Sequence, residues 1–154
     1  MPKILILFAD EDIAMVNAVA EGARAVRFSE VETRRAGVPA LPGGVEDLAQ
    51  FDAIVLGVSA RGAIHPEIQR VIAQAAKALP TVSWQNKVGS AFVAAPDAGD
   101  QIADPWPALA TLGGMGMLVV APAGAHGEAA RALGTRVAQV VAWVTHARSH
   151  HHAH

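Results

Sequence analysis

Hydrophobic and polar positions follow two patterns that alternate along the chain. Short, continuous apolar runs are typical of strands that are buried on both faces, whereas apolar residues at every third or fourth position are typical of helices. Strands of the buried kind are predicted at 4–8, 52–58, 88–95 and 117–120. A further strand is predicted at 28–34, where Val31 and Thr33 are flanked by charges, which is typical of the edge of a sheet.

Helical patterns separate the predicted strands. They lie at 12–26, 46–50, 65–79, 101–112 and 128–146. Because strands that alternate with helices form a parallel sheet covered on both faces, we expect a doubly wound α/β domain. Five strands and five helices suit the strand order 2-1-3-4-5. The runs 4–8, 54–56 and 118–120 are apolar on both faces, so central positions in the sheet are expected for them.

The chain length of 154 residues predicts one domain with a full core. We expect this domain to span 1–147 and to be followed by a His-rich tail at 148–154. Three interpretations of the tail stay open, namely a natural terminus, a metal-binding tract or a remnant of an expression tag.

Composition excludes several classes of protein. The chain has no cysteine, so it has no disulfide framework, thiol chemistry or zinc–thiolate site. Twelve basic and fourteen acidic residues give a net charge of −2, which gives no electrostatic reason to expect nucleic acid or a membrane surface as a partner. Since no segment approaches the roughly 20 apolar residues of a spanning helix, we expect a soluble cytoplasmic protein.

Three segments resemble one protein family. They are Val45–Gly57 with its continuation through Ser59–Gly62, Trp106–Leu109 with Gly114–Val120, and Glu128–Gly134. Together they resemble the flavodoxin-like superfamily and, within it, the tryptophan-repressor-binding-protein type of NAD(P)H:quinone oxidoreductase. The resemblance covers nearly the whole chain. It implies a flavodoxin-like three-layer sandwich, FMN as cofactor, a small-molecule electron donor or acceptor as partner, and a homo-oligomer.

The resemblance also implies where FMN would bind. Three loops at the carboxyl ends of the strands would hold it, at 9–13, 58–63 and 94–99. The cofactor-binding residues implied are Ala9, Asp10, Asp12, Ile13, Ser59, Ala60, Arg61, Gly62, Pro96, Asp97 and Gly99. The phosphate would meet the backbone amides of Asp12 and Ile13, and the flavin ring would face the second and third loops.

Each of the three loops departs from the family pattern, which has hydroxyl side chains and a glycine in the first. This chain has Asp10, Glu11 and Asp12 instead. One acid could be the N-cap of the following helix, worth about 1 kcal/mol, but three exceed that need. A carboxylate about 4 Å from a phosphate charge costs about 1 kcal/mol in water and about 4 kcal/mol at an effective dielectric constant of 20. The alternative function is therefore a flavin-free family member that acts as a binding or assembly module.

The acidic loop also suggests a response-regulator receiver, which has the same topology and holds Mg²⁺ with acidic residues. A receiver needs an aspartate after its third strand and a lysine after its fifth. This chain has Leu56–Val58 and Ala121–Pro122 at those places, so only weak divalent-cation binding by Asp10 and Asp12 remains as a minor alternative.

A few other side chains are candidates for chemistry. His65 and His126 follow strand ends and could donate protons in the cleft or cap helices. Trp84 could lie near a flavin ring or pack over a sheet edge, and Trp106 and Trp143 could belong to the core or to an interface. Ser59 and Ser90 lack the sequence context of a catalytic nucleophile.

Overall fold

The computed structural model describes residues 1–9, 13–59, 64–77, 84–93, 104–122 and 127–152, with the backbone alone for 148–152. These residues hold five strands and five helices. In chain order the elements are β1 (Lys3–Phe8), α1 (Ala14–Arg24), β2 (Glu30–Arg35), α2 (Val45–Ala49), β3 (Ala53–Val58), α3 (Pro66–Lys77), β4 (Val88–Val93), α4 (Trp106–Gly114), β5 (Leu118–Val119) and α5 (Gly127–His152).

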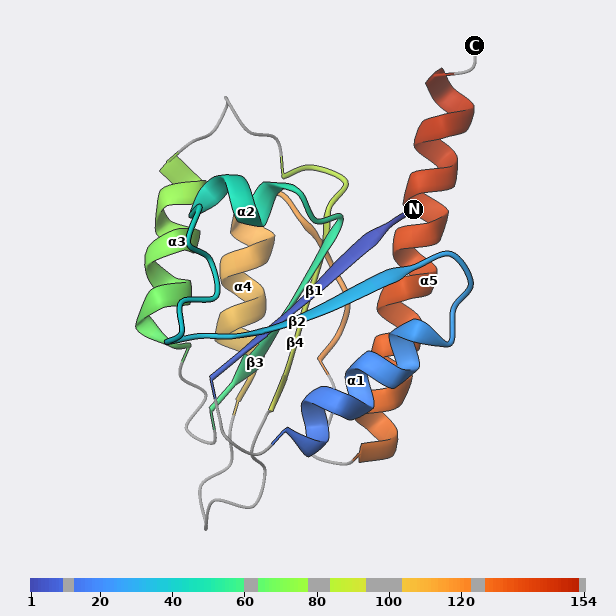
Figure 1. Ribbon diagram of the computed structural model, residues 1–154. Coiled ribbons are helices and arrows are strands. Elements are labelled where there is room, and N and C mark those ends of the chain that lie inside the picture. The colour runs from blue at the N-terminus through green and yellow to red at the C-terminus, as the bar shows by residue number, and fades with distance from the viewer. Residues whose placement is uncertain (10–12, 60–63, 78–83, 94–103, 123–126, 153–154) are drawn as a thin grey trace.

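The strands form one parallel sheet in the order β2-β1-β3-β4-β5, which confirms the predicted order. Helices α1 and α5 cover one face of the sheet, and α2, α3 and α4 cover the other (Figure 1). No helix in the described part of the chain is long and apolar enough to cross a membrane.

Two apolar clusters form the core, one on each face of the sheet. In β1 the side chains of Ile4 and Ile6 pack toward α1 and α5, and those of Leu5 and Leu7 pack toward the other three helices. Every residue of β3 and β4 is buried. Burial on both faces is the reason why these strands appear in the sequence as continuous apolar runs.

Helices α1 and α5 approach each other closely because both carry glycine at the crossing. A Cβ atom on Gly22 would collide with the carbonyl oxygen of Arg131, and one on Gly134 would collide with that of Val19. The hydroxyl of Thr135 donates a 2.9 Å hydrogen bond to the carbonyl oxygen of Gly22. The crossing fixes the position of α1, and with it the position of the first turn of that helix.

Three predicted elements differ from the structure. The run 118–120 has the apolar pattern expected of a central strand, but β5 lies at the edge of the sheet, as the predicted strand order requires, and both of its residues are exposed. The fourth helix begins at Trp106 instead of residue 101, because the carboxylate of Asp104 accepts a 3.0 Å hydrogen bond from the Trp106 N–H and Pro105 occupies the N-cap. Helix α5 continues beyond the predicted end at residue 146, as far as His152.

Candidate functional site

The carboxyl ends of the parallel strands meet at one edge of the sheet, and α1 and α3 begin at that edge (Figure 1). Ala9 follows β1 and Ser59 follows β3, its neighbour in the sheet. Ile13 immediately precedes α1. The structure therefore brings these three predicted residues to the same edge. The other predicted site residues, Asp10, Asp12, Ala60, Arg61, Gly62, Pro96, Asp97 and Gly99, lie outside the described residues.

Helix α1 starts at this edge without a polar N-cap side chain. Its N-cap residue is Ile13, which is 46% exposed, and the Asn17 N–H donates a 2.8 Å hydrogen bond to the Ile13 carbonyl oxygen. The expectation that Asp10 or Asp12 is the N-cap residue is therefore wrong, because the helix begins after the acidic run. The first turn of α1 holds no acidic residue. Because α1 begins at the carboxyl edge of the sheet, the positive end of its dipole faces that edge.

Arg35 adds a positive charge to the same edge. It is the last residue of β2, it lies beside Phe8 in the register of the two strands, and its side chain is exposed. The N–H of the next residue, Ala36, donates a 2.7 Å hydrogen bond to the Phe8 carbonyl oxygen. The sequence interpretation missed Arg35, because the register between two strands cannot be read from the chain. A hollow of about 380 Å³ adjoins it, lined in part by Arg34 and Pro39.

Hydrogen bonds connect the start of α3 to the loop that follows β2. The Glu67 carboxylate accepts hydrogen bonds from the backbone N–H groups of Gly37 (2.8 Å) and Leu41 (3.2 Å). The Nδ1 atom of His65 accepts a 3.1 Å hydrogen bond from the Glu67 N–H, so His65 is a helix cap, as one of its two interpretations predicted. His126 lies outside the described residues.

The Glu67 carboxyl has a perturbed pKa. Burial raises the pKa of this group, but hydrogen bonds from the backbone N–H groups of Gly37, Ala40 and Leu41 outweigh burial and leave the pKa below its ordinary value. The carboxylate is therefore the form that the surrounding structure favours. This perturbed group serves to hold two segments together beside the candidate site.

Trp84 lies far from the predicted cofactor edge. It precedes β4, at the amino end of the sheet, and is fully buried with its Nε1–H donating a 3.3 Å hydrogen bond to the Ala75 carbonyl oxygen. Of the two interpretations of Trp84, a position near a flavin is wrong, because the flavin loops follow the opposite ends of the strands, and the indole packs in the core instead. Trp106 and Trp143 are 60% and 68% exposed, so they are not core residues. Their alternative, a place in an interface, stays a prediction.

Ser90 also has a structural role. Its buried hydroxyl donates a 2.9 Å hydrogen bond to the Val120 carbonyl oxygen, which ties β4 to the end of β5. Among the described residues no group of three or more histidine, aspartate and glutamate side chains is arranged to hold a metal ion.

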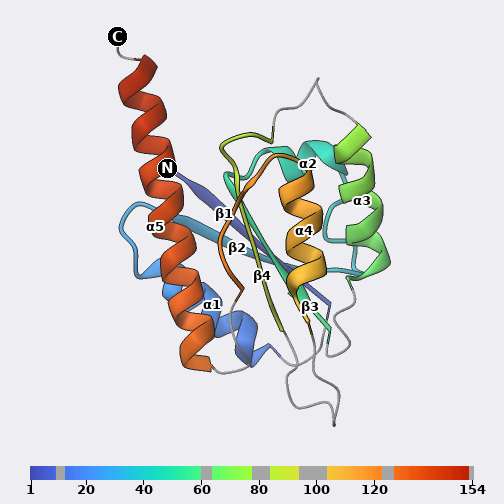
Figure 2. The same ribbon diagram turned by 180° about the vertical axis from the view of Figure 1, so that it is seen from behind.

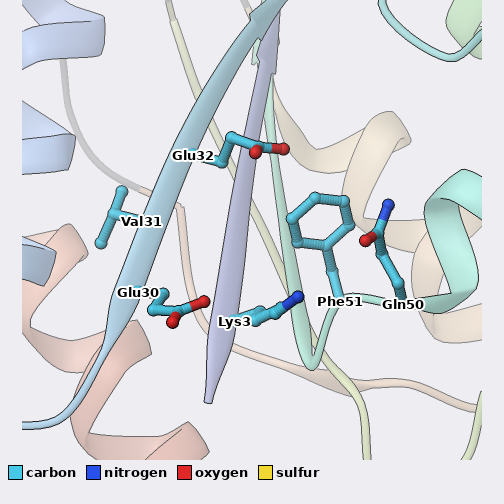
Figure 3. A pocket seen from close by; sticks show the side chains of 6 residues that line it. All are labelled: Lys3, Glu30, Val31, Glu32, Gln50 and Phe51. Carbon is cyan, nitrogen blue, oxygen red and sulfur yellow. The ribbon is translucent and has the colours of Figure 1, made fainter. Parts of the chain in front are cut away.

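Two further hollows lie away from the carboxyl edge. One of about 320 Å³ is at the amino end of β1 and β2, where Lys3, Glu30, Glu32, Gln50 and Phe51 surround it (Figure 3). The other, of about 400 Å³, lies between α3 and α4 and is lined mainly by apolar side chains such as Ile72 and Met115. Neither hollow contains a residue of the predicted cofactor site.

Known structures identify this architecture. A WrbA-like flavodoxin from Agrobacterium tumefaciens is similar over 93% of this chain and 99% of its own, with a TM-score of 0.68 and 24% sequence identity. This chain has the flavodoxin-like fold. The predicted flavodoxin-like fold is thereby confirmed, and a WrbA-like flavodoxin is among the structures that share it.

Two more flavodoxin-like structures support the same assignment. The diflavin flavoprotein A3 from Nostoc sp. has a TM-score of 0.68 and 18% identity, with 97% of each chain covered. The two-electron reduced flavodoxin of Megasphaera elsdenii has a TM-score of 0.62 and 20% identity, and the match covers 88% of this chain and 98% of that one. No protein-family model matches the chain, and no curated protein matches it.

Proposed function

We propose that this flavodoxin-like protein binds FMN at the carboxyl edge of its sheet and acts as a cytoplasmic oxidoreductase, with NAD(P)H as electron donor and quinones as acceptors. One observation carries the proposal, namely that α1 begins at the end of β1 with Ile13, an exposed N-cap residue that has no side-chain acceptor. The positive end of a helix is a favourable position for a phosphate. The flavodoxins and flavoprotein with the same fold support the assignment.

The described residues at this edge fit an anionic cofactor. The first turn of α1 carries no acid, and Arg35 places a guanidinium at the end of the adjacent strand. Ser59 follows β3 and is half-buried, beside the predicted position of the flavin ring. When bound, FMN would supply the redox chemistry, and the protein would hold it in position and shield it from water.

One observation favours a second function, a flavin-free binding or assembly module. The residues between β1 and α1 include Asp10, Glu11 and Asp12, whose charges oppose a phosphate at the start of the helix. Arg35 and the α1 dipole act in the other direction, so FMN binding is the first proposal and the flavin-free module the second.

The test is binding of FMN to the purified full-length chain. The expected result is flavin absorbance at about 450 nm in the purified protein, or quenching of flavin fluorescence when FMN is added. Oxidation of NADH or NADPH by the loaded protein with a benzoquinone acceptor then tests the reaction. A colourless chain that leaves the fluorescence of added FMN unchanged contradicts the FMN proposal and supports the flavin-free module.

Removal of two acidic charges from the first loop tests the electrostatic argument. Asp10→Ser combined with Glu11→Thr is expected to tighten FMN binding at least about tenfold, because two repelling carboxylates are removed. The matched control is Glu30→Ser with Glu46→Thr, which removes two exposed acids away from the cofactor edge and should leave the affinity unchanged. Equal affinities for the wild type and the loop variant would show that the acids do not face the phosphate.

A further inference from the structure

The two edges of the sheet differ in charge. Edge strand β2 carries Glu30, Glu32 and Arg34 on one of its faces. Edge strand β5 consists of Leu118 and Val119, which are 45% and 42% exposed, and the whole stretch 115–122 has no charged residue. Charges on an edge strand hinder pairing with another chain. The β5 edge lacks this protection and has the composition of a buried strand.

The backbone of β5 leaves hydrogen-bonding groups directed away from the sheet. The N–H groups of Leu118 and Val120 donate to β4, to the carbonyl oxygens of Lys87 and Gly89, each at 2.8 Å. Successive residues of a strand direct these groups to opposite sides. The N–H and C=O groups of Val119 therefore point away from β4, toward the position that a further strand would occupy.

Helix α5 extends the apolar edge. Its residues Arg131, Gly134 and Thr135 contact α1, and α1 lies toward β1 and β2. Helical periodicity places Val140 and Trp143 on the opposite flank of α5. That flank faces the β5 side of the sheet, because α5 covers β4 (Figure 2).

Of this flank, Trp143 is 68% exposed and Val140 is half-buried. We define the β5 surface as Leu118, Val119, Val140 and Trp143. Three of its four members are large hydrophobic side chains that the protein leaves exposed, although they belong to two elements that are far apart in the sequence.

We infer that the β5 surface is the interface between two copies of this chain, with their β5 strands antiparallel across a two-fold axis. Such an interface is self-complementary, because the uncharged β5 strand can meet its own copy without repulsion between like charges. It would cover the exposed apolar side chains and pair the outward backbone groups of Val119. The inference does not depend on whether FMN binds.

The charges of α5 also favour a second copy as the occupant. Arg136 precedes Trp143 by seven positions, which is about two helical turns, so both lie on the same flank. A two-fold axis that passes near Val140 relates the two positions in the two copies. It would place each Arg136 guanidinium against the indole of the other copy, a cation–π arrangement formed twice.

Sedimentation equilibrium of the full-length chain tests the inference. The wild type is expected to sediment with about twice the chain mass of 15.9 kDa, and Val119→Lys to sediment as a monomer. The matched control is Val38→Lys, since Val38 is a 69% exposed valine in the loop after β2. This control should stay dimeric. A wild type that is monomeric at every concentration overturns the inference and leaves the β5 surface to a different partner.

A second pair of variants decides the case if Val119→Lys does not fold, as judged by circular dichroism. Trp143→Ser changes an exposed helical side chain and should weaken the dimer without lowering the melting temperature of the monomer. Trp106→Ser removes another exposed tryptophan, from α4, and should leave the dimer intact. A dimer that survives Trp143→Ser unchanged, or that both tryptophan variants weaken equally, contradicts this interface.

Discussion

Glu67 joins two segments that the chain keeps about thirty residues apart. Its carboxylate accepts N–H groups from the loop after β2, and its own N–H is bound to His65 at the start of α3. Glu67→Gln is expected to destabilise the protein by about 1 kcal/mol, or roughly 2–4 °C in melting temperature, because an amide cannot replace both acceptor oxygens. Glu46→Gln, at an exposed position of α2, is the control and should change the melting temperature little.

The lowered pKa of Glu67 makes the stabilisation from this contact depend on pH. Because the folded pKa is lowered, the stabilisation is fully present above the ordinary glutamate pKa of about 4.3 and is lost as the pH falls through the folded value. Melting curves of the wild type and Glu67→Gln measured from neutral to acidic pH are expected to converge at the acidic end. Curves that stay equally far apart at all pH values would show that the carboxylate charge is not the cause.

The roles of single residues were also the hardest to predict from the sequence. Neither Glu67 nor Arg35 stands in a motif, and each acquires its role only through a neighbour that the fold brings close. A carboxylate bound by backbone amides leaves no spacing pattern in the chain. Trp84 shows that residue type alone does not decide a role. An indole that suits a flavin wall equally suits a buried position at the other end of the sheet.

At the scale of elements, the α1–α5 crossing is the contact most sensitive to one added methyl group. Gly22→Ala or Gly134→Ala is expected to destabilise the protein by about 1–3 kcal/mol, since the new Cβ would force the helix backbones apart. Thermal unfolding measures the loss. Gly114→Ala is the matched control, because a Cβ there meets nothing within 4 Å and helix propensity favours alanine. Equal melting temperatures for all three variants would contradict the tight crossing.

Elements were predictable from the sequence where a strand is buried on both faces. The continuous apolar runs of β1, β3 and β4 mark strands covered on both faces, and the structure confirms them. The same argument failed for β5, because an apolar run shows that a strand avoids water but not what covers it. The start of α4 was wrong for a local reason, since Asp104 and Pro105 delay the helix to Trp106.

For the molecule as a whole, the alternation of strands and helices was sufficient to predict the strand order, because few topologies bury this set of elements. The candidate site was predictable only as a place, the carboxyl edge of the sheet. Its chemistry depends on the balance between the acids at 10–12 and the positive groups that the fold adds, the α1 dipole and Arg35. That balance is a property of the folded chain, and FMN affinity measures it.

Hydrogen exchange followed by NMR measures the protection of backbone amides both in the core and at the β5 surface. The amides of β3 are expected to exchange slowest, because every residue of this strand is buried and it pairs on both sides.

The Val119 amide points away from β4, so it should exchange rapidly in dilute protein. It should become protected as the protein concentration rises and β5 pairs with a second copy. The Val31 amide, in the other edge strand, is the control and should exchange at the same rate at every concentration. If Val119 exchanges at one rate throughout while sedimentation detects a dimer, the copies associate through a different surface.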